Sequence, residues 1–456
     1  MRRLAHHRIL FALLAFALLS PSPARSQIGD PIVYDPVRPQ PLPSAPAPFA
    51  APIDWPVPTS EQTTTYSTVY PSRSMSIATE STPADSPLFD ECVPDVFGRH
   101  RVWGEVDFVL MATRRAPIGV PLVTTGPAND PLAGYLSSAN TRIVIGNETF
   151  NQGISSGGRL RAGFWFDDYK SLGLEFAGFL VASPRSSITT GSNGDVVLSR
   201  PVDLPTGPGV YDIAFPTFVR GSFLVESIQR FGGAEANFVG FLIGDQRFSF
   251  EVLGGLRFLS LEESLRLRYQ VNNLQPMLAF GGDLLPVDSL ITAVDSYSTR
   301  NHFYGGQVGG RLDWNYGKFN LGASAKLALG VNDQRLTING STTRFDGATS
   351  LYAGGVFANA SNIGRYDTSR FAMVPEFGLK AGWWITPNIR VHLGYNLILW
   401  TDVLRPGNQI SRSVDPALVP LDRNFNPLNP VNRVTPTYLR SDFWAEGLIL
   451  GLDFRF

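Results

Sequence analysis

Apolar side chains occupy every second position at the end of this chain. These positions are Leu448, Leu450, Leu452 and Phe454. The residues between them include Asp453 and Arg455, and the last residue is Phe456. Because successive side chains of a β-strand point to opposite faces, the pattern predicts a strand with one apolar and one mostly polar face. Such a strand, ending in an aromatic residue, is typical of a lipid-embedded barrel, where closure pairs every backbone group.

The same alternation recurs from His100 onward in ten segments, each long enough to cross a membrane at about 9–11 residues per strand. They begin near Arg101, Gly158, Ser171, Gly232, Gln246, Asn301, Lys318, Phe371, Asn388 and Asp442. Short connections rich in turn residues lie at 167–170, 244–245, 315–317 and 386–387. Long connections run over 113–157, 183–231, 259–300, 331–370 and 402–441.

This alternation of short and long connections indicates an even-stranded barrel with both ends on the periplasmic side. We expect an all-β, transmembrane antiparallel up-and-down barrel of about ten strands with long extracellular loops. If the long loops contain hairpins, for instance around 263–269 and 334–339, twelve or fourteen strands remain open. A mean hydropathy of +0.00 excludes a helical membrane bundle but suits a barrel, in which only alternate residues are apolar. Trp314, Trp383, Trp384, Trp400 and Trp444 fall near strand ends, where interfacial girdles form.

A soluble β-sandwich is the alternative, because it also alternates, with its apolar face inward. Such a fold would need neither export nor alternating loop lengths. Residues 1–26 have the features of a signal peptide, with Arg2 and Arg3 before the apolar run Ile9–Leu19. Residues 27–98 are rich in Pro, Ser and Thr and predict a disordered periplasmic segment. We expect residues 99–456 to form the barrel. The single cysteine, Cys92, has no intrachain partner.

The polar face of the strands carries charges of both signs in near balance. The candidate lumen-lining residues are Arg161, Glu175, Glu251, Arg257, Arg311, Lys326, Glu376, Lys380, Arg390 and His392. A selective channel usually has an excess of one sign at its constriction, so the balance indicates ion pairs that bridge the lumen. An interior of eight to ten strands is also filled largely by side chains. One residue fits poorly, because Glu446 shares the outward parity of Leu448 unless a bulge at Gly447 changes the register.

Catalytic and ligand-binding motifs are weak in this chain. The three histidines after residue 26 are His100, His302 and His392, and they lack the spacing of a zinc site. His302 could pair with Asp295 as acid and base, although a polar residue at a strand start is the simpler interpretation. We therefore expect no enzyme activity, no cofactor and no catalytic, cofactor-binding or metal site. The net charge of −1 gives no reason to expect nucleic acid as a partner.

Several segments resemble the beta-barrel porin-7 family of bacterial outer-membrane proteins, from about Trp103 to Phe456. They are Leu122–Thr125, Gly254–Glu263, Thr299–Gly309, Ser361–Gly364, Val374–Glu376, Gly394–Ile410 and Phe443–Leu448. Ser411 stands where an acidic residue is expected after Gln409-Ile410. The resemblance implies a barrel in the cell outer membrane and brings no catalytic or binding residues.

The functional hypothesis is an outer-membrane barrel with a narrow or charge-filled lumen. Its role would be structural, at the cell surface, or a selective porin-like passage of small solutes. The alternative is a surface-binding module built from the extracellular loops, which contain Phe215, Phe218, Leu274, Leu284, Leu285, Tyr352 and Phe357. A barrel hydrolase is a weaker third hypothesis. Expected partners are outer-membrane lipid, small solutes or ions, and periplasmic or cell-wall contacts of residues 27–98.

Overall fold

The computed structural model describes residues 100–150, 152–182, 185–245, 247–276, 279–281, 283–431 and 434–456. The predicted signal peptide, the Pro-rich segment and Cys92 lie outside these residues. Within the described part of the chain, no helix is long and apolar enough to cross a membrane.

The structure consists of strands and two short 3₁₀ helices. In order they are β1 (Val102–Thr113), β2 (Ala116–Thr125), β3 (Arg142–Phe150), β4 (Ile154–Trp165), β5 (Gly173–Val181), β6 (Arg185–Ser192), β7 (Leu198–Leu204), β8 (Gly207–Ala214), β9 (Val219–Gly244), β10 (Phe248–Asn273), β11 (Ala279–Phe280), β12 (Asp283–Leu284), β13 (Leu290–Tyr316), β14 (Phe319–Phe345), β15 (Thr349–Ala353), β16 (Gly364–Thr386), β17 (Ile389–Leu404), η1 (Pro406–Gln409), η2 (Pro416–Leu418) and β18 (Arg440–Arg455).

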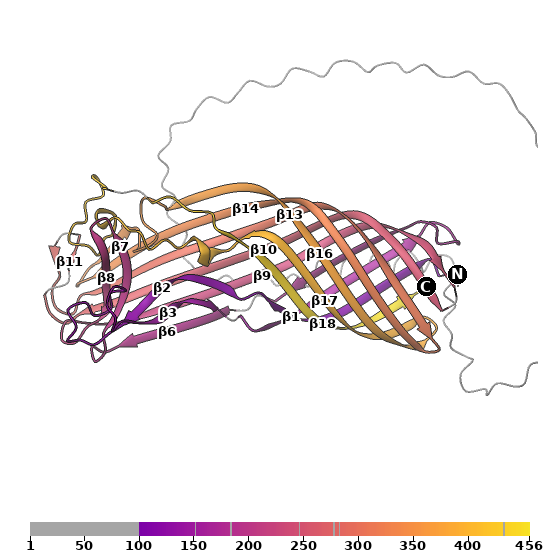
Figure 1. The fold of residues 1–456 in the computed structure, drawn as a ribbon, viewed down its shortest axis with the longest axis horizontal. Helices are drawn as coiled ribbons and strands as arrows, with labels where there is room; N and C mark the ends of the chain where they lie inside the picture. The colour runs from indigo at the N-terminus through magenta and orange to yellow at the C-terminus, as the bar shows by residue number, and fades with distance from the viewer. Residues whose placement is uncertain are drawn as a thin grey trace, which may run out of the picture. The chain divides into compact units, whose positions relative to one another are not determined.

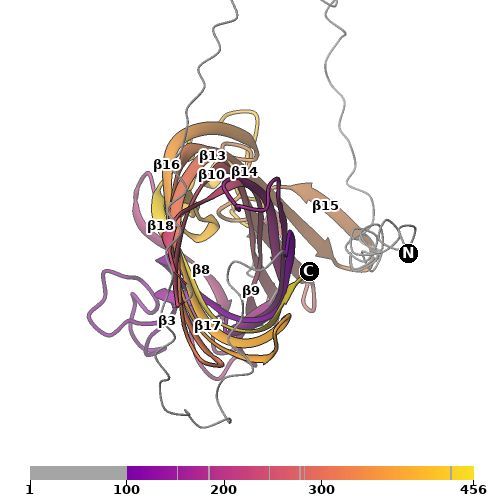
Figure 2. The same cartoon turned by 90° about the vertical axis from the view of Figure 1, so that its right-hand side faces the viewer.

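Ten of these strands pair in a closed ring. Figures 1 and 2 show the barrel that they form. The order is β1-β4-β5-β9-β10-β13-β14-β16-β17-β18, and β18 pairs again with β1. Every pairing in the ring is antiparallel. The predicted ten-stranded antiparallel barrel is therefore confirmed. All four predicted short turns connect strands at one end, which is the periplasmic end in barrels of this kind.

The strands β9, β10, β13 and β14 are much longer than a membrane crossing requires. They contain 26, 26, 27 and 27 residues. At ~3.3 Å per residue and a tilt of ~40°, such a strand rises about 65 Å, against an apolar band of about 25 Å. The expectation that 259–300 and 331–370 are mainly loops is therefore wrong, because more than half of each range continues β10, β13, β14 and β16 beyond the membrane. The possible hairpins around 263–269 and 334–339 lie within the extended β10 and β14, so they add no further strand to the ring.

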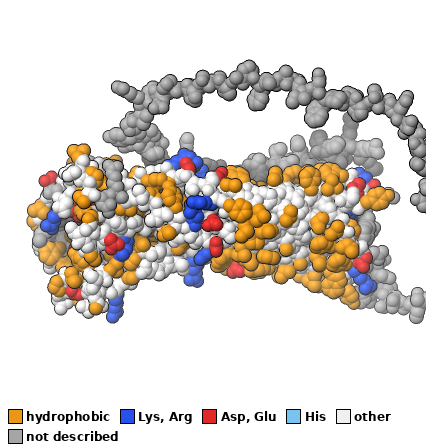
Figure 3. Space-filling view, turned by 45° about the horizontal axis from the view of Figure 1, so that its top comes forward, with side chains coloured by type: hydrophobic (Ala, Val, Ile, Leu, Met, Phe, Trp, Pro, Cys, Tyr) orange, Lys and Arg blue, Asp and Glu red, His pale blue; other side chains and the backbone are white. Residues whose placement is uncertain are grey.

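The polarity of the two strand faces reverses midway along the long strands. In the turn-side half of β10, Val252 and Leu256 face outward and Arg257 is buried. In the other half, Leu261 and Leu265 are buried while the outward positions are polar. Because β10 pairs with β13 without a register shift, the same alternate positions face outward along the whole strand. Only the polarity of the residues at these positions changes. Figure 3 shows the result, a wide apolar belt over the turn-side half bordered by charged side chains.

An extracellular head fills the other half of the barrel. Strands β3, β2, β7 and β8 form a separate four-stranded sheet, and β6 and β15 pair with β9 and β14. Figure 1 places β2, β3, β6, β7 and β8 at the end of the barrel away from the C-terminus. One apolar core joins this sheet to the inward faces of the long strands and to residues 404–421. The predicted loops 113–157 and 183–231 thus fold largely into this head.

Two further details of the strands differ from or resolve the sequence expectation. Trp314 and Trp383 face outward as girdle residues should, but Trp384 and Trp400 are fully buried inside the ring. Glu446 lies on a regular stretch of β18, without a bulge at Gly447. Its carboxylate accepts a hydrogen bond from Tyr395 on the outer face of β17.

Candidate functional site

Charged side chains cross the barrel lumen in its membrane-spanning half. The structure places all ten predicted lumen-lining residues in this interior, each in at least one ion pair. Many of these pairs join strands that are not neighbours in the ring. Lys326 of β14 binds Glu235 of β9 at 2.6 Å, and Arg311 of β13 binds Glu175 of β5 at 2.9 Å. The ion pairs therefore bridge the lumen rather than line an open path.

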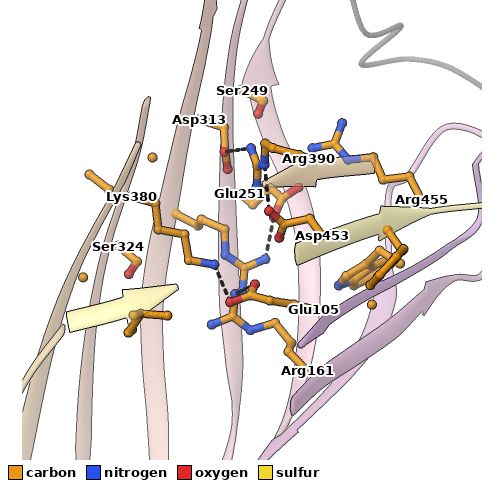
Figure 4. A pocket seen from close by; sticks show the side chains of 18 of the residues that line it. Glu105, Arg161, Ser249, Glu251, Asp313, Ser324, Lys380, Arg390, Asp453 and Arg455 are labelled. Atoms are coloured by element: carbon orange, nitrogen blue, oxygen red, sulfur yellow. Dashed lines mark hydrogen bonds and ion pairs between the residues drawn. The ribbon is translucent and has the colours of Figure 1, made fainter. Parts of the chain in front are cut away.

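Glu105 is the centre of the largest group of ion pairs. Its carboxylate is almost fully buried and accepts from Arg159 at 2.8 Å, Arg161 at 2.9 Å and Lys380 at 2.5 Å. Figure 4 shows Lys380 and Arg161 converging on Glu105, with Arg390 between Asp313 and Asp453. A buried carboxylate requires such partners, because an unpaired charge in an apolar medium is very costly.

His392 lies between two carboxylates near this group. Its Nε2 is 3.0 Å from Asp107 and its Nδ1 is 2.8 Å from Asp453. Glu105, Asp107 and His392 together could offer three ligands to a metal ion. Arg159 already binds both carboxylates of this set, so a cation there would compete with a guanidinium in place. The arrangement suits a fixed polar core better than a metal centre.

The lumen contains two pockets within this charged layer. The first, of about 1310 Å³ including space open to solvent, begins at the turn end beside His100 and Tyr169 and reaches Glu105 and Arg455. The second, of about 560 Å³, is lined by Arg257, Lys326 and Glu376 on one side and by apolar residues such as Leu259 on the other.

An apolar layer crosses the ring on the extracellular side of these pockets. Its buried side chains come from nearly every strand of the ring: Val109, Met111, Phe231, Leu259, Leu261, Phe303, Ala328, Ala372, Val374, Ile398, Trp400, Val403, Phe443, Ala445 and Ile449. Phe231 of β9 and Phe443 of β18 are not on neighbouring strands, yet their ring centroids are 5.2 Å apart. Each residue of the layer is at most 4% exposed and this contact crosses the ring, so little water reaches the lumen at this level.

Two fully buried arginines then attach the head to the barrel. Arg405 donates to Glu263 of β10 at 2.8 Å and lies over the ring of Phe443. Arg200 of β7 pairs with Asp295 of β13 at 2.5 Å and stacks on Phe357 at 4.1 Å. The second oxygen of Asp295 accepts the backbone N–H groups of Phe357 and Ala358. These contacts hold β7 and the segment 354–363 against the inner face of the long strands.

The pairing of His302 with Asp295 does not form. Asp295 faces inward and binds Arg200, whereas His302 faces outward and packs against Phe258 and Tyr304. Seven residues separate the two positions, and an odd separation along one strand places side chains on opposite faces. The acid–base hypothesis is wrong for this pair.

Residues 103–456 match the family described as "Putative beta barrel porin-7 (BBP7)". The chain belongs to this family. The suspected resemblance is thereby confirmed over nearly the whole barrel. No curated protein matches the sequence.

Among solved structures, this porin-7 barrel is similar to the outer membrane protease OmpT from Escherichia coli, at 10% identity and a TM-score of 0.39, covering 79% of this chain and 98% of that one. It is also similar to a Pseudomonas aeruginosa FadL homologue (10%, TM-score 0.21, covering 80% and 92%) and to the P. putida toluene transporter TodX (8%, TM-score 0.17, covering 81% and 93%). None of the three reaches a TM-score of 0.5, and the ten-stranded ring is assigned from its own strand pairings.

The sequence prediction for this porin-7 barrel missed Arg200 and gave Asp295 a different partner, His302. Arg405 and Glu263 were noted only as parts of the family-like segments Gly394–Ile410 and Gly254–Glu263, without a role. Gly407 is required because a Cβ there would overlap the carbonyl of Pro117 on β2. This close approach fixes the start of η1 against the head.

Proposed function

We propose that the protein is an outer-membrane barrel closed to bulk diffusion, with a charge-filled lumen and a structural or cell-surface role. The observation that carries the proposal is the apolar layer across the ring. It follows the charged layer in series, so water and ions that enter the first pocket from the turn end meet a dry barrier. Apolar constrictions block ions even when a narrow gap remains, because the gap loses its water.

Single-channel recording in planar bilayers tests this proposal. The purified full chain is expected to insert without producing a stable conductance in the nanosiemens range. Heat-modifiable migration on a gel and a β-rich circular dichroism spectrum establish that the inserted protein is the folded barrel. A stable nanosiemens pore from such a preparation would contradict the proposal and support a general porin.

Surface binding by the head is the second candidate function. The apolar and aromatic loop residues expected to bind a partner mostly serve the head's own core. Leu285 and Phe357 are fully buried, and Phe215, Phe218 and Tyr352 pack against that core. Other apolar side chains remain available, with Leu284 68% and Leu428 94% exposed. Deleting 402–441 would remove Arg405 and much of the core, so deletion of 424–437 is the sharper test. Lost binding to a cell-surface partner with unchanged unfolding would favour the binding module.

We propose no catalytic role. The one acid–base pair that the sequence suggested points to opposite faces of β13. Most charged groups that the structure describes in the lumen are engaged in ion pairs below the apolar layer, and the first pocket begins at the turn end of the barrel.

A further inference from the structure

Three successive rows of side chains cross the outer wall of β10, β13, β14 and β16 where the apolar belt ends. In the first row, the residues directly opposite one another on neighbouring strands are Phe258, Tyr304, Val331 and Phe371. The next row consists of Ser260, His302, Asp333 and Ser369. The third row is charged and extends to β9: Arg230, Glu262, Arg300, Arg335 and Asp367. We call this third row the arginine ladder.

The ladder contains two arginines directly opposite each other, Arg300 and Arg335. Opposed like charges on neighbouring strands destabilise a sheet when nothing lies between them. Arg300 has Glu262 on its other side at 2.9 Å, and Arg335 has Asp367 at 2.6 Å. Each of these carboxylates is also shared with a second arginine, Arg230 at 4.0 Å or Arg365 at 3.2 Å.

The group therefore has four arginines and two acids, a net charge of +2. Asp333, one row nearer the membrane, accepts a hydrogen bond from Ser369 and reduces the local excess to +1. Arg300 and Arg335 remain 47% and 36% exposed, so their guanidinium groups keep N–H donors free to bind an anion.

The ladder lies at the height of lipid headgroups. Two rows correspond to ~13 Å along a strand, or about 10 Å along the barrel axis at a tilt of ~40°. Tyr304 and Phe258 mark the aromatic level at which membrane interfaces are anchored. Long arginine side chains can extend back to that level while their heads remain in water. The ladder is on the side away from the short turns, which faces the outer leaflet.

We propose that Arg300 and Arg335 form a site for the phosphorylated headgroup of an outer-leaflet lipid. Directly opposed positions on an antiparallel pair have Cβ atoms about 4.5–5.5 Å apart, so one phosphate can accept from both guanidinium groups. The lipid chains then lie along the exposed row of Tyr304, Val331 and Phe371. A phosphate between the two arginines also removes the like-charge contact that the bare ladder contains.

Native mass spectrometry of the full chain in neutral detergent micelles, titrated with dioctanoyl phosphatidic acid, tests the site. The double variant Arg300→Gln/Arg335→Gln is expected to weaken the tightest lipid-binding step by about 25-fold, from roughly fivefold per arginine at an anionic surface. The control Arg266→Gln/Arg268→Gln removes two exposed charges from the same wall of β10, beyond the ladder. It is expected to change that step by less than about twofold.

Two further probes separate the sources of the phosphate. Dioctanoylglycerol, with the same chains and no phosphate, is expected to bind all variants alike. Inorganic phosphate at equal concentration is expected not to displace the lipid. An equal loss in both double variants, no loss in either, or displacement by inorganic phosphate would overturn the proposal. If the glutamine variant does not show heat-modifiable migration, Arg300→Lys/Arg335→Lys replaces it. That variant keeps the charge but loses the bidentate fork, so unchanged affinity would equally reject the site.

Discussion

At the scale of single residues, burial decides what an ion pair contributes. Glu376 accepts from Arg257 and from Asn396 and is nearly buried. Glu376→Gln leaves the Arg257 guanidinium without its carboxylate inside the lumen, which typically costs about 3–5 kcal/mol. We expect a lower urea midpoint with no gain in conductance. The matched change Glu262→Gln, on the outer wall, should cost less than about 1 kcal/mol. Unchanged stability with altered ion selectivity in Glu376→Gln would mean that the lumen is wet.

Asp212 of β8 gives the head a pH dependence of its own. Burial raises the pKa of this carboxyl, and the hydrogen bond from Ser199 only partly offsets that effect. Because the folded state then holds the proton more tightly than the unfolded state, this contribution is full at low pH. It is lost as the pH rises from about 3.9, the ordinary value, through the raised pKa.

Thermal unfolding of wild type and Asp212→Asn at several pH values between 3 and 7 measures this contribution. The variant is expected to gain stability relative to wild type as the pH rises. Asp130→Asn is the contrast, because hydrogen bonds from the Leu132 backbone, Ser138 and Asn140 lower the pKa of Asp130, which is partly exposed. Its small effect should have the opposite sign. A difference between wild type and Asp212→Asn that does not vary with pH would contradict the argument.

The sequence predicted the inward charges because each lies on a strand whose parity is visible locally. It could not predict Arg200 or Arg405, because neither belongs to a ring strand and their partners are distant. Arg405 and Glu263 are 142 residues apart. Parity gives the face of a side chain, whereas only the closed ring and the packed head bring such partners together.

At the scale of elements, the sequence revealed the ten crossings but not the length of the strands. The prediction ended each strand where outward apolar residues ended. In β10 this point is near Phe258, after which Leu259, Leu261 and Leu265 are buried. The outer face must be apolar where it contacts lipid and polar where it contacts water. One continuous strand therefore shows two opposite patterns of apolar and polar residues along its sequence. Such a reversal at fixed parity is the physical mark of a barrel that extends beyond its membrane.

The segment 354–363 depends on one carboxylate of β13. Asp295→Ala removes the acceptor of the Phe357 and Ala358 N–H groups and leaves Arg200 buried without its partner. We expect faster hydrogen exchange in 354–363 and in β7, with the membrane-spanning strands unchanged. Asp333→Ala, an exposed position on β14, serves as the control and should leave exchange in both segments as in wild type. Equal protection in Asp295→Ala would show that the apolar core alone holds the segment.

At the scale of the whole molecule, the apolar layer and the head obstruct the lumen in series, beyond the charged layer whose first pocket begins at the turn end. A conducting path needs both of these obstructions open at once, so removing one of them should not produce a pore. Phe231→Ala/Phe443→Ala removes the contact between the two phenyl rings that crosses the apolar layer. Water can then reach the head, where Val414, Val419 and Leu421 still pack on the long strands.

Conductance is therefore expected only when this double variant is combined with deletion of 405–421. Phe108→Ala/Phe377→Ala removes the same volume from the outer face, where both rings are about half exposed to lipid, and controls for general loosening of the barrel. Planar-bilayer recordings compare the phenylalanine double variant, the deletion, their combination and the control. Each protein is first checked for heat-modifiable migration. Conductance from the phenylalanine variant alone would mean that the head does not close the barrel. Conductance from the deletion alone would mean that the apolar layer is not a barrier.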